Sequence, residues 1–371
     1  MPSPRPDRRG STLIVVMLLI CMMMLAIAGA FVRTSAERRN AMDAAAQVDA
    51  FTLALDGIDK YIATVSSVPT LPDSQTFTLT GGRVVVTLRA MRLSSTDTTL
   101  VLISRGENTS GNKYASDAAT ATRTVTQLVR WSAATMQIPA AFVSLSGFDK
   151  NGNSGALSGV DACATAPAPL PSIPGIAVPS ISSGNLAADY TGFTGPIDGN
   201  PDNTPVAIGT PGPAGTAKDS VNIDWAGISA RTALTPTYYW KTSSPTSGSW
   251  PTAAQLSGTN WPVTFVNGDL TLPSNGQGIL IVTGNMTVNG STQWDGIVLI
   301  GGTITSNGNN TFYGAMFTGL NVITGSTVAR QALGNGNKTF QYNSCDVSKS
   351  LNPFGSWTRI GNGRTDNFPV Y

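Results

Sequence analysis

The chain contains the stretch Ser11-Thr-Leu-Ile-Val-Val-Met-Leu-Leu-Ile-Cys-Met-Met-Met-Leu-Ala-Ile-Ala-Gly-Ala-Phe-Val32, in which no residue is charged. As an α-helix that rises about 1.5 Å per residue, residues 11–32 are roughly 33 Å long, which is enough to span the hydrocarbon core of a bilayer. A buried core helix can be equally apolar, but it seldom runs this long without one polar face. The stretch therefore predicts a transmembrane helix.

The residues before this stretch form a short basic segment, Met1-Pro-Ser-Pro-Arg-Pro-Asp-Arg-Arg-Gly10. An ordinary secretory signal places a small-residue cleavage site after its apolar region. The chain instead continues Arg33-Thr-Ser-Ala-Glu-Arg-Arg39, so we interpret residues 1–10 as a leader peptide of another kind. Arginines lie on both sides of the apolar stretch, and the short leader favours a cytoplasmic N-terminus with an exported remainder.

The junction between leader and apolar stretch resembles a class III prepilin signal, with Arg8-Arg-Gly10 followed by Ser11-Thr-Leu-Ile14. In that class a prepilin peptidase cuts after the glycine, and the new N-terminus is methylated. The resemblance implies cleavage between Gly10 and Ser11 and methylation of the amine of Ser11.

The segment Arg8–Tyr61 is most similar to the N-terminal region of PilX-type minor type IV pilins. Val15 stands where most pilins carry a glutamate, which pairs with the N-terminal amine of a neighbouring subunit. PilX-type minor pilins and K-type pseudopilins also tend to lack that glutamate. The departure at Val15 argues against a bulk filament subunit.

The resemblance implies a structural minor pilin that primes, caps or decorates a type IV pilus. Its partners would be other pilin subunits, reached through the N-terminal helix, together with the inner membrane and the prepilin peptidase. Its location would be the inner membrane, single-pass with the C-terminal part periplasmic, and then the pilus or cell surface. Two alternatives stay open: a surface adhesin that recognises a glycan or protein, and a K-type pseudopilin of a type II secretion system.

Composition excludes several classes of function. The chain of 371 residues has no histidine, three cysteines and a net charge of +2. It therefore lacks histidine-based acid–base catalysis, histidine metal ligands and a four-thiolate zinc site. The small net charge and the lack of a basic run beyond the leader argue against a nucleic-acid partner. The 39 glycines and 23 prolines predict a turn-rich β structure after the helix.

The helix is expected to continue over residues 11–65. Apolar residues at helical spacing form one stripe: Val48, Phe51, Leu55, Ile58, Ile62 and Val65. Pro69 ends the helix. Four strands are then expected, Thr76–Thr80, Arg83–Arg89, Thr99–Ser104 and Ala121–Arg130, with a hairpin turn at Gly81-Gly82. A long helix that packs on such a meander is the pilin-like plan, so residues 66–138 are predicted to form a pilin-like β-sheet domain.

The remaining residues, 139–371, carry an internal repeat. Gly278, Gly296 and Gly314 are evenly spaced, and short apolar runs such as Ile279–Val282 and Ile297–Ile300 follow the same step. Such a period with Asn/Gly corners predicts a parallel β-solenoid head, with a β-sandwich as the less favoured alternative. Residues 142–159 are interpreted as a candidate earlier coil, separated by a Pro/Gly-rich insertion at about 164–262. The predicted fold class is α+β.

The sequence predicts neither an enzyme nor a cofactor or metal site. The repeats contain only two carboxylates, Asp269 and Asp295, which do not occupy matching coil positions as a polysaccharide-cleaving site would require. The spacing of Asp149, Asn151 and Asn153 resembles a calcium loop, but an Asn/Gly turn is the favoured interpretation. Tryptophans at 225, 240, 250 and 261 are interpreted as packing residues rather than sugar platforms.

The cysteines allow one further prediction. Cys21 lies in the apolar helix and is interpreted as a packing residue. Cys163 and Cys345 are the two cysteines of the exported part, where oxidising conditions favour disulfides. We predict a disulfide between them, with two separate buried thiols as the alternative.

Overall fold

The fold is taken from a computed structural model of the chain, which describes residues 11–65, 68–69, 71–93, 98–108, 121–152, 154–164, 170–179, 190–193, 195–209, 221, 223–241, 245, 248–333 and 336–366. The chain divides into two compact units. The first comprises Met1–Trp131 and Trp357–Tyr371, and the second comprises Ser132–Ser356. The fold is an α+β mixture with one antiparallel sheet and several parallel pairings.

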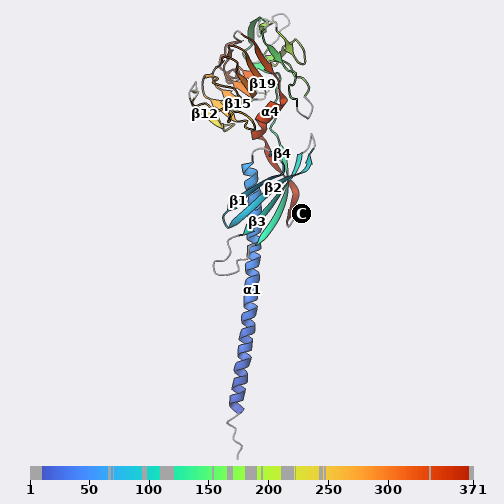
Figure 1. The fold of residues 1–371 in the computed structure, drawn as a ribbon, viewed down its shortest axis with the longest axis vertical. Coiled ribbons are helices and arrows are strands. Elements are labelled where there is room, and N and C mark those ends of the chain that lie inside the picture. Colours follow the sequence, from blue (N-terminus) through green and yellow to red (C-terminus); the bar gives the residue numbers. More distant parts are fainter. Residues whose placement is uncertain are drawn as a thin grey trace, which may run out of the picture. The chain divides into compact units, whose positions relative to one another are not determined.

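The first unit begins with one long helix, α1 (Ser11–Thr64). Its N-terminal half carries no strand against it in Figure 1, whereas its C-terminal half lies along the sheet. The large apolar side chains of residues 13–32 are all exposed, from 46% for Ile20 to 73% for Leu25. Among the described residues, the first half of this continuous helix therefore has no packing partner, and its second half lies in the core of its own unit.

The helix meets the sheet through small residues as well as through the predicted stripe, whose Ile58 is buried in the core of this unit. Ala50 and Ala54 are fully buried, whereas Val48 of the stripe is 62% exposed. A Cβ atom added at Gly57 would lie 2.4 Å from Val84 Cγ2, and one at Gly106 would lie 2.3 Å from the carbonyl oxygen of Ala50. Such close approach requires residues without bulk on both elements. The predicted stripe residues Phe51, Leu55 and Ile62 flank this contact and are only partly buried.

Five strands form the sheet of the first unit, in the order β1-β2-β3-β4-β22. They are β1 (Asp73–Leu79), β2 (Gly82–Leu93), β3 (Thr98–Asn108), β4 (Thr122–Ser132) and β22 (Ser356–Asp366). Leu79 pairs with Gly82, so the two-residue turn is Thr80-Gly81 rather than Gly81-Gly82. Gly81 has φ 95°, which favours glycine at that turn.

The fifth strand is a correction to the predicted domain boundary. Residues 357–366 were assigned to the second domain, but β22 lies beside β4 in the first sheet. Trp357 donates from its indole nitrogen to the carbonyl oxygen of Val65 at 2.7 Å, and its ring meets Trp131 edge-on at 4.9 Å. Arg359 also forms an ion pair with Asp59. These contacts return the end of the chain to the end of α1.

The second unit is built mainly from short parallel strands. The longest row of paired strands has the order β10-β7-β21-β19-β17-β15-β13-β12. Its members are β10 (Ile197–Asp198), β7 (Ala156–Ser158), β21 (Lys338–Gln341), β19 (Asn310–Thr318), β17 (Gln293–Ile300), β15 (Gly276–Val282), β13 (Val263–Val266) and β12 (Tyr238–Trp240). A second row consists of β14 (Leu270–Thr271), β16 (Met286–Val288) and β18 (Ile304–Ser306).

The predicted repeat corresponds to parallel pairing in register. Gly278 pairs with Gly296, and Gly296 pairs with Gly314. The central strands β15, β17 and β19 are largely buried on both faces, which explains their continuous apolar runs. In β15, for example, Leu280 and Val282 belong to one hydrophobic cluster, while Ile279 and Ile281 belong to another.

Residues 142–159, the candidate earlier coil, join this stack at a different level from the predicted one. β5 (Phe142–Ser144) pairs with the second half of β19, while β21 pairs with the first half. The segment therefore continues the stack after the last repeat and does not precede the first. Parts of the predicted insertion also supply strands, namely β8 (Ile176–Val178), β9 (Tyr190–Phe193), β10, β11 (Val206–Ala207) and β12.

Shorter elements complete the second unit. They are β6 (Phe148–Gly152), β20 (Gln331–Ala332), the helices α3 (Trp225–Ser229) and α4 (Ser344–Leu351), and the 3-10 helices η2 (Leu320–Thr324) and η3 (Asn352–Phe354). Trp225 and Val347 pack in the hydrophobic cluster on one face of the main sheet. Helix α4 thereby covers strands β15, β17 and β19.

Candidate functional site

The predicted processing site lies at the start of α1. Gly10 falls outside the described residues, and Ser11 is the first residue of the helix. Cleavage after Gly10 and methylation at Ser11 therefore stay predictions. Val15, four residues into the helix, is 61% exposed and has no protein neighbour that buries it.

The helix surface formed by residues 13–32, which follow the predicted processing site, is apolar on all sides. Charged side chains return at Arg33, which forms an exposed ion pair with Glu37 at 3.0 Å. Among the described helices, one is long and apolar enough to cross a membrane, and it covers Leu13–Thr64. Burying one large aliphatic side chain is worth about 1.5–3 kcal/mol. The exposed residues 13–32 therefore gain tens of kcal/mol, in order of magnitude, from any apolar cover, whether lipid or other helices.

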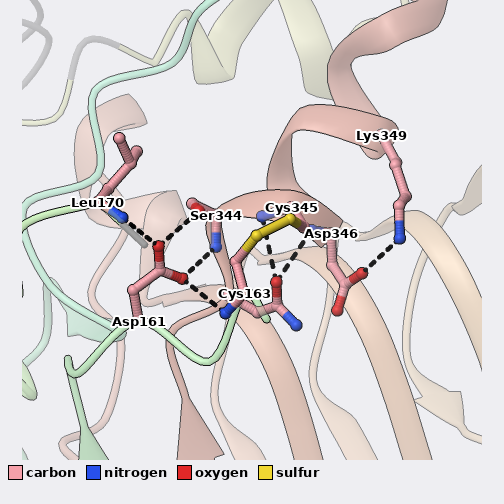
Figure 2. The surroundings of a disulfide bond; sticks show 8 residues. Asp161, Cys163, Leu170, Ser344, Cys345, Asp346 and Lys349 are labelled. Carbon is pink, nitrogen blue, oxygen red and sulfur yellow. Dashed lines mark hydrogen bonds and ion pairs between the residues drawn. A yellow bond between two sulfur atoms is a disulfide. The ribbon is translucent and has the colours of Figure 1, made fainter. Parts of the chain in front are cut away.

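The second candidate site is a disulfide that joins two distant segments of the second unit. Cys163 and Cys345 lie with their Cα atoms 5.3 Å apart and their sulfur atoms bonded (Figure 2). Each cysteine follows a strand of a parallel pair, because Gln341 of β21 is in register with Ser158 of β7. The amide of Ala162 also donates to the carbonyl oxygen of Tyr342 at 3.0 Å. The topology thus brings the two predicted partners together.

A carboxylate beside the cysteines holds the same two chain segments. The two oxygens of Asp161 accept hydrogen bonds from the amide and hydroxyl of Ser344, at 2.9 and 2.6 Å (Figure 2). They also accept from the amides of Cys163 and Leu170, at 3.1 and 2.7 Å. Partial burial pushes the pKa of Asp161 upward, but these hydrogen bonds outweigh it and lower the pKa.

Helix α4 is anchored at this point by its N-cap. The side-chain oxygen of Asn343 accepts from the amides of Cys345 and Asp346, at 3.1 and 3.2 Å. Asp346 in the first turn forms an ion pair with Lys349 at 3.3 Å. Burial raises the pKa of Asp346, and Lys349 offsets part of that rise. The cap therefore places Cys345 in the first turn of a fixed helix.

Two of these residues were missed from the sequence. Asn343 could have been found, because an asparagine followed by an acid in the next turn is a helix N-terminus signal. Asp161 carried no such signal, since its four donors come from three separate positions along the chain.

We expect Asp161→Asn to lower the stability of the second unit at neutral pH and to flatten its dependence on acid. The folded-state pKa lies below the ordinary value of 3.8. The carboxylate therefore contributes stability that is present above the ordinary pKa and is lost as pH falls through the folded pKa. Thermal melts between about pH 7 and pH 3 should converge for the two proteins at the acid end.

The control for this prediction is Asp202→Asn, which removes one charge from an exposed side chain of the same unit. Its melting curve should stay parallel to that of the natural protein over the whole range. A difference between Asp161→Asn and the natural protein that grows toward acid pH would contradict the assigned role of Asp161.

The residues considered for other chemistry have structural partners. Asp269 accepts the amide of Asn285 at 2.6 Å, and Asp295 accepts the side-chain amide of Gln293 at 2.9 Å. Trp225 is fully buried. Across the residues that the structure describes, no group of three or more His, Cys, Asp or Glu side chains is placed to hold a metal ion. Asn153 of the calcium-like spacing lies outside the described residues.

Sequence comparison with known proteins assigns the chain to no family. No protein-family profile and no curated protein matches the chain. Among solved structures, the chain is similar to the competence-associated pilin ComZ from Thermus thermophilus, with 11% identity and a TM-score of 0.24. The match covers 86% of this chain and 97% of that one.

Proposed function

We propose that this protein is a membrane-inserted, pilin-like structural subunit without enzymatic activity. One observation carries the proposal: α1 exposes an apolar surface over residues 13–32 and then packs its second half on its own antiparallel sheet. A subunit of this build can sit in a membrane through the first half and later exchange lipid for the helices of neighbouring subunits. The resemblance of the segment Arg8–Tyr61 to minor pilins supports the same role.

The finer role that we propose is a minor pilin of the PilX type that primes, caps or decorates the filament. Val15 lacks the carboxylate that would pair with the N-terminal amine of an adjacent subunit. An unpaired charge buried in a filament core is costly. A subunit at the tip has no neighbour that imposes this requirement. We place the protein in the inner membrane with its larger part periplasmic, before assembly into a surface filament.

The parallel row of strands supports a β-solenoid as the architecture of the second unit. Successive strands pair at the step of the sequence repeat, as Gly278 with Gly296 and Gly296 with Gly314 illustrate. Each level buries apolar side chains against the next, so stacking contributes to stability.

The experiment that tests the role is to shear surface filaments, purify them and probe them for this protein. The proposal expects co-purification, with immunogold labels that are sparse or at the filament tips. Uniform labelling along the filaments would contradict a minor role. Absence from filaments, together with dependence of protein secretion on the chain, would favour the K-type pseudopilin. Absence from filaments, together with binding of intact cells to glycans or proteins through the second unit, would favour the adhesin.

The processing step gives a further prediction. We expect the mature chain to begin at Ser11 with a methylated amine, because Gly10 has no Cβ and suits a narrow protease subsite. Gly10→Val should leave the leader attached, whereas Gly29→Val, inside the exposed helix with open space around it, should be processed normally. N-terminal sequencing and mass spectrometry of both proteins decide the matter. A mature chain that starts elsewhere would refute the predicted cleavage.

A further inference from the structure

The second unit contains a cleft of about 290 Å³ beside its smaller row of parallel strands. The side chains that line it include Asn285, Thr303, Asn321, Ser326, Thr327 and Val328, and none of the lining residues is charged. This volume lies at the lower end of the range for small-molecule sites, about 300–1,000 Å³. The cleft therefore admits one small unit of a ligand.

The floor of the cleft is built from glycines that bring backbone and asparagine side chains close together. A Cβ atom added at Gly302 would lie 2.3 Å from the side-chain oxygen of Asn285. That oxygen instead accepts hydrogen bonds from the amide and hydroxyl of Thr303, at 2.9 and 3.2 Å. The backbone N–H of Asn285 donates to the carboxylate of Asp269 at 2.6 Å. The position of Asn285 is thus fixed before any ligand binds.

The side-chain oxygen of Asn285 is occupied by Thr303, whereas the side-chain nitrogen is available to donate to a ligand. Among the residues that the structure describes, no side chain or backbone group accepts a hydrogen bond from Asn285 Nδ2. Among the other lining residues, the exposed hydroxyls of Ser326 and Thr327 have no hydrogen-bond partner within the described part of the chain. Val328 adds an apolar contact beside them. The cleft thus combines uncharged donors and acceptors with one apolar patch.

A regular polar face continues from the cleft. Asn285 and Thr303 come directly before β16 and β18, whose outward residues are Thr287 and Thr305. Thr271 pairs with Thr287, and Thr287 pairs with Thr305, so three threonines stand in register on neighbouring strands. Paired strands lie about 4.8 Å apart. Hydroxyls thus repeat along the stack at nearly the length of one sugar ring.

We propose that this cleft and threonine row bind a neutral oligosaccharide, with one sugar in the cleft and the chain running along the stack. Fixed amide and hydroxyl groups match sugar hydroxyls, and Val328 matches the apolar face of a pyranose ring. The absence of any lining charge disfavours phosphates and acidic sugars. The proposal does not depend on the filament role, since it concerns the second unit alone.

The test uses the full chain in a detergent without a sugar headgroup, because a maltoside would compete for the cleft. An array of neutral and anionic glycans identifies the probe, and titration calorimetry with the strongest neutral oligosaccharide measures affinity. Asn285→Asp keeps the oxygen that accepts from Thr303 but replaces the NH₂ donor, and should weaken binding about tenfold or more. Asn267→Asp is the matched control, because Asn267 also accepts from a threonine hydroxyl, at 3.0 Å, but lies outside the cleft.

Two more variants keep the test decisive if Asn285→Asp unfolds. Ser326→Ala with Thr327→Ala removes two exposed hydroxyls, and Ala329→Trp fills the cleft from an exposed position. Both should weaken binding while thermal unfolding stays unchanged. Binding to no neutral glycan, preference for anionic glycans, or equal effects of Asn285→Asp and Asn267→Asp would each overturn the proposal.

Discussion

Replacing Gly296 by alanine is expected to destabilise the second unit by roughly 3–5 kcal/mol. Gly296 has φ 122°, a region that residues with a side chain rarely occupy. An added Cβ atom would lie 2.4 Å from the carbonyl oxygen of Gly278 and 2.3 Å from Ser350 Oγ. Ser350 is fully buried in α4, so neither neighbour has room to move. The change therefore imposes backbone strain and a clash at once.

Two control glycines separate these causes. Gly290 has φ 80° but open space around its would-be Cβ, so Gly290→Ala measures backbone strain alone, about 1–2 kcal/mol. Gly248 has open space and no positive φ, so Gly248→Ala should change stability by less than about 1 kcal/mol. Urea unfolding of the detergent-solubilised chain, followed by tryptophan fluorescence, gives the three free energies. A loss at Gly296 no larger than that at Gly290 would rule out the close contact between levels.

The same glycines explain why parallel stacking could be predicted. Gly278, Gly296 and Gly314 all have positive φ, and each added Cβ would meet a backbone oxygen of the preceding level. Each level therefore needs a glycine at the same place, which makes the repeat visible in the sequence. The apolar runs between these glycines are equally regular because the sheet is buried on both faces.

The order of the levels could not be predicted in the same way. β5 stacks on β19 although about 170 residues separate them in sequence. A local period contains no information about which distant segment covers its last level. β8, β10 and β11 are also too short to show an alternating pattern, and prolines at 174 and 179 flank β8. The segment therefore resembled an irregular insertion.

In the first unit, the sequence pattern missed contacts of small residues and one exposed strand. The predicted stripe counted large apolar residues, and its member Ile58 is buried against the sheet. It left out Ala50, Ala54 and Gly57, through which the helix also meets the sheet. Small residues carry little hydropathy signal, yet they permit the closest approach of helix and strand. β22 was missed because only three of its 11 side chains are even partly buried, so its sequence resembles a loop. Its place beside β4 depends on contacts such as Gln127 to Ile360, which no local pattern encodes.

Removing both Cys163 and Cys345 is expected to lower the stability of the second unit strongly. The bridge closes a loop with a sequence separation of 182 residues. The chain-entropy estimate for a loop of this length is about 5 kcal/mol, and residual structure in the unfolded chain reduces the measured value. Cys163→Ser with Cys345→Ser should therefore lower the free energy of unfolding of the second unit by up to about that amount.

Cys21→Ser is the matched control, because Cys21 is exposed on the apolar half of α1 and takes no part in the bridge. It should leave the unfolding transition of the second unit unchanged. The natural protein unfolded in the presence of a reductant should behave like the double variant. Equal stability of the natural protein, the reduced protein and the double variant would contradict a stabilising bridge.

Non-reducing mass spectrometry of the protein purified without a reductant tests the bond itself. A linked pair of peptides that contain Cys163 and Cys345 is the expected result, and two free thiols would rule out the bridge. Even then Asp161 holds Ser344 through two hydrogen bonds, and Ala162 is bonded to Tyr342. Those contacts keep the two segments together in the folded state without a covalent link. The disulfide should therefore act chiefly on the unfolded chain, so its loss should lower stability without altering glycan binding by the cleft at Asn285.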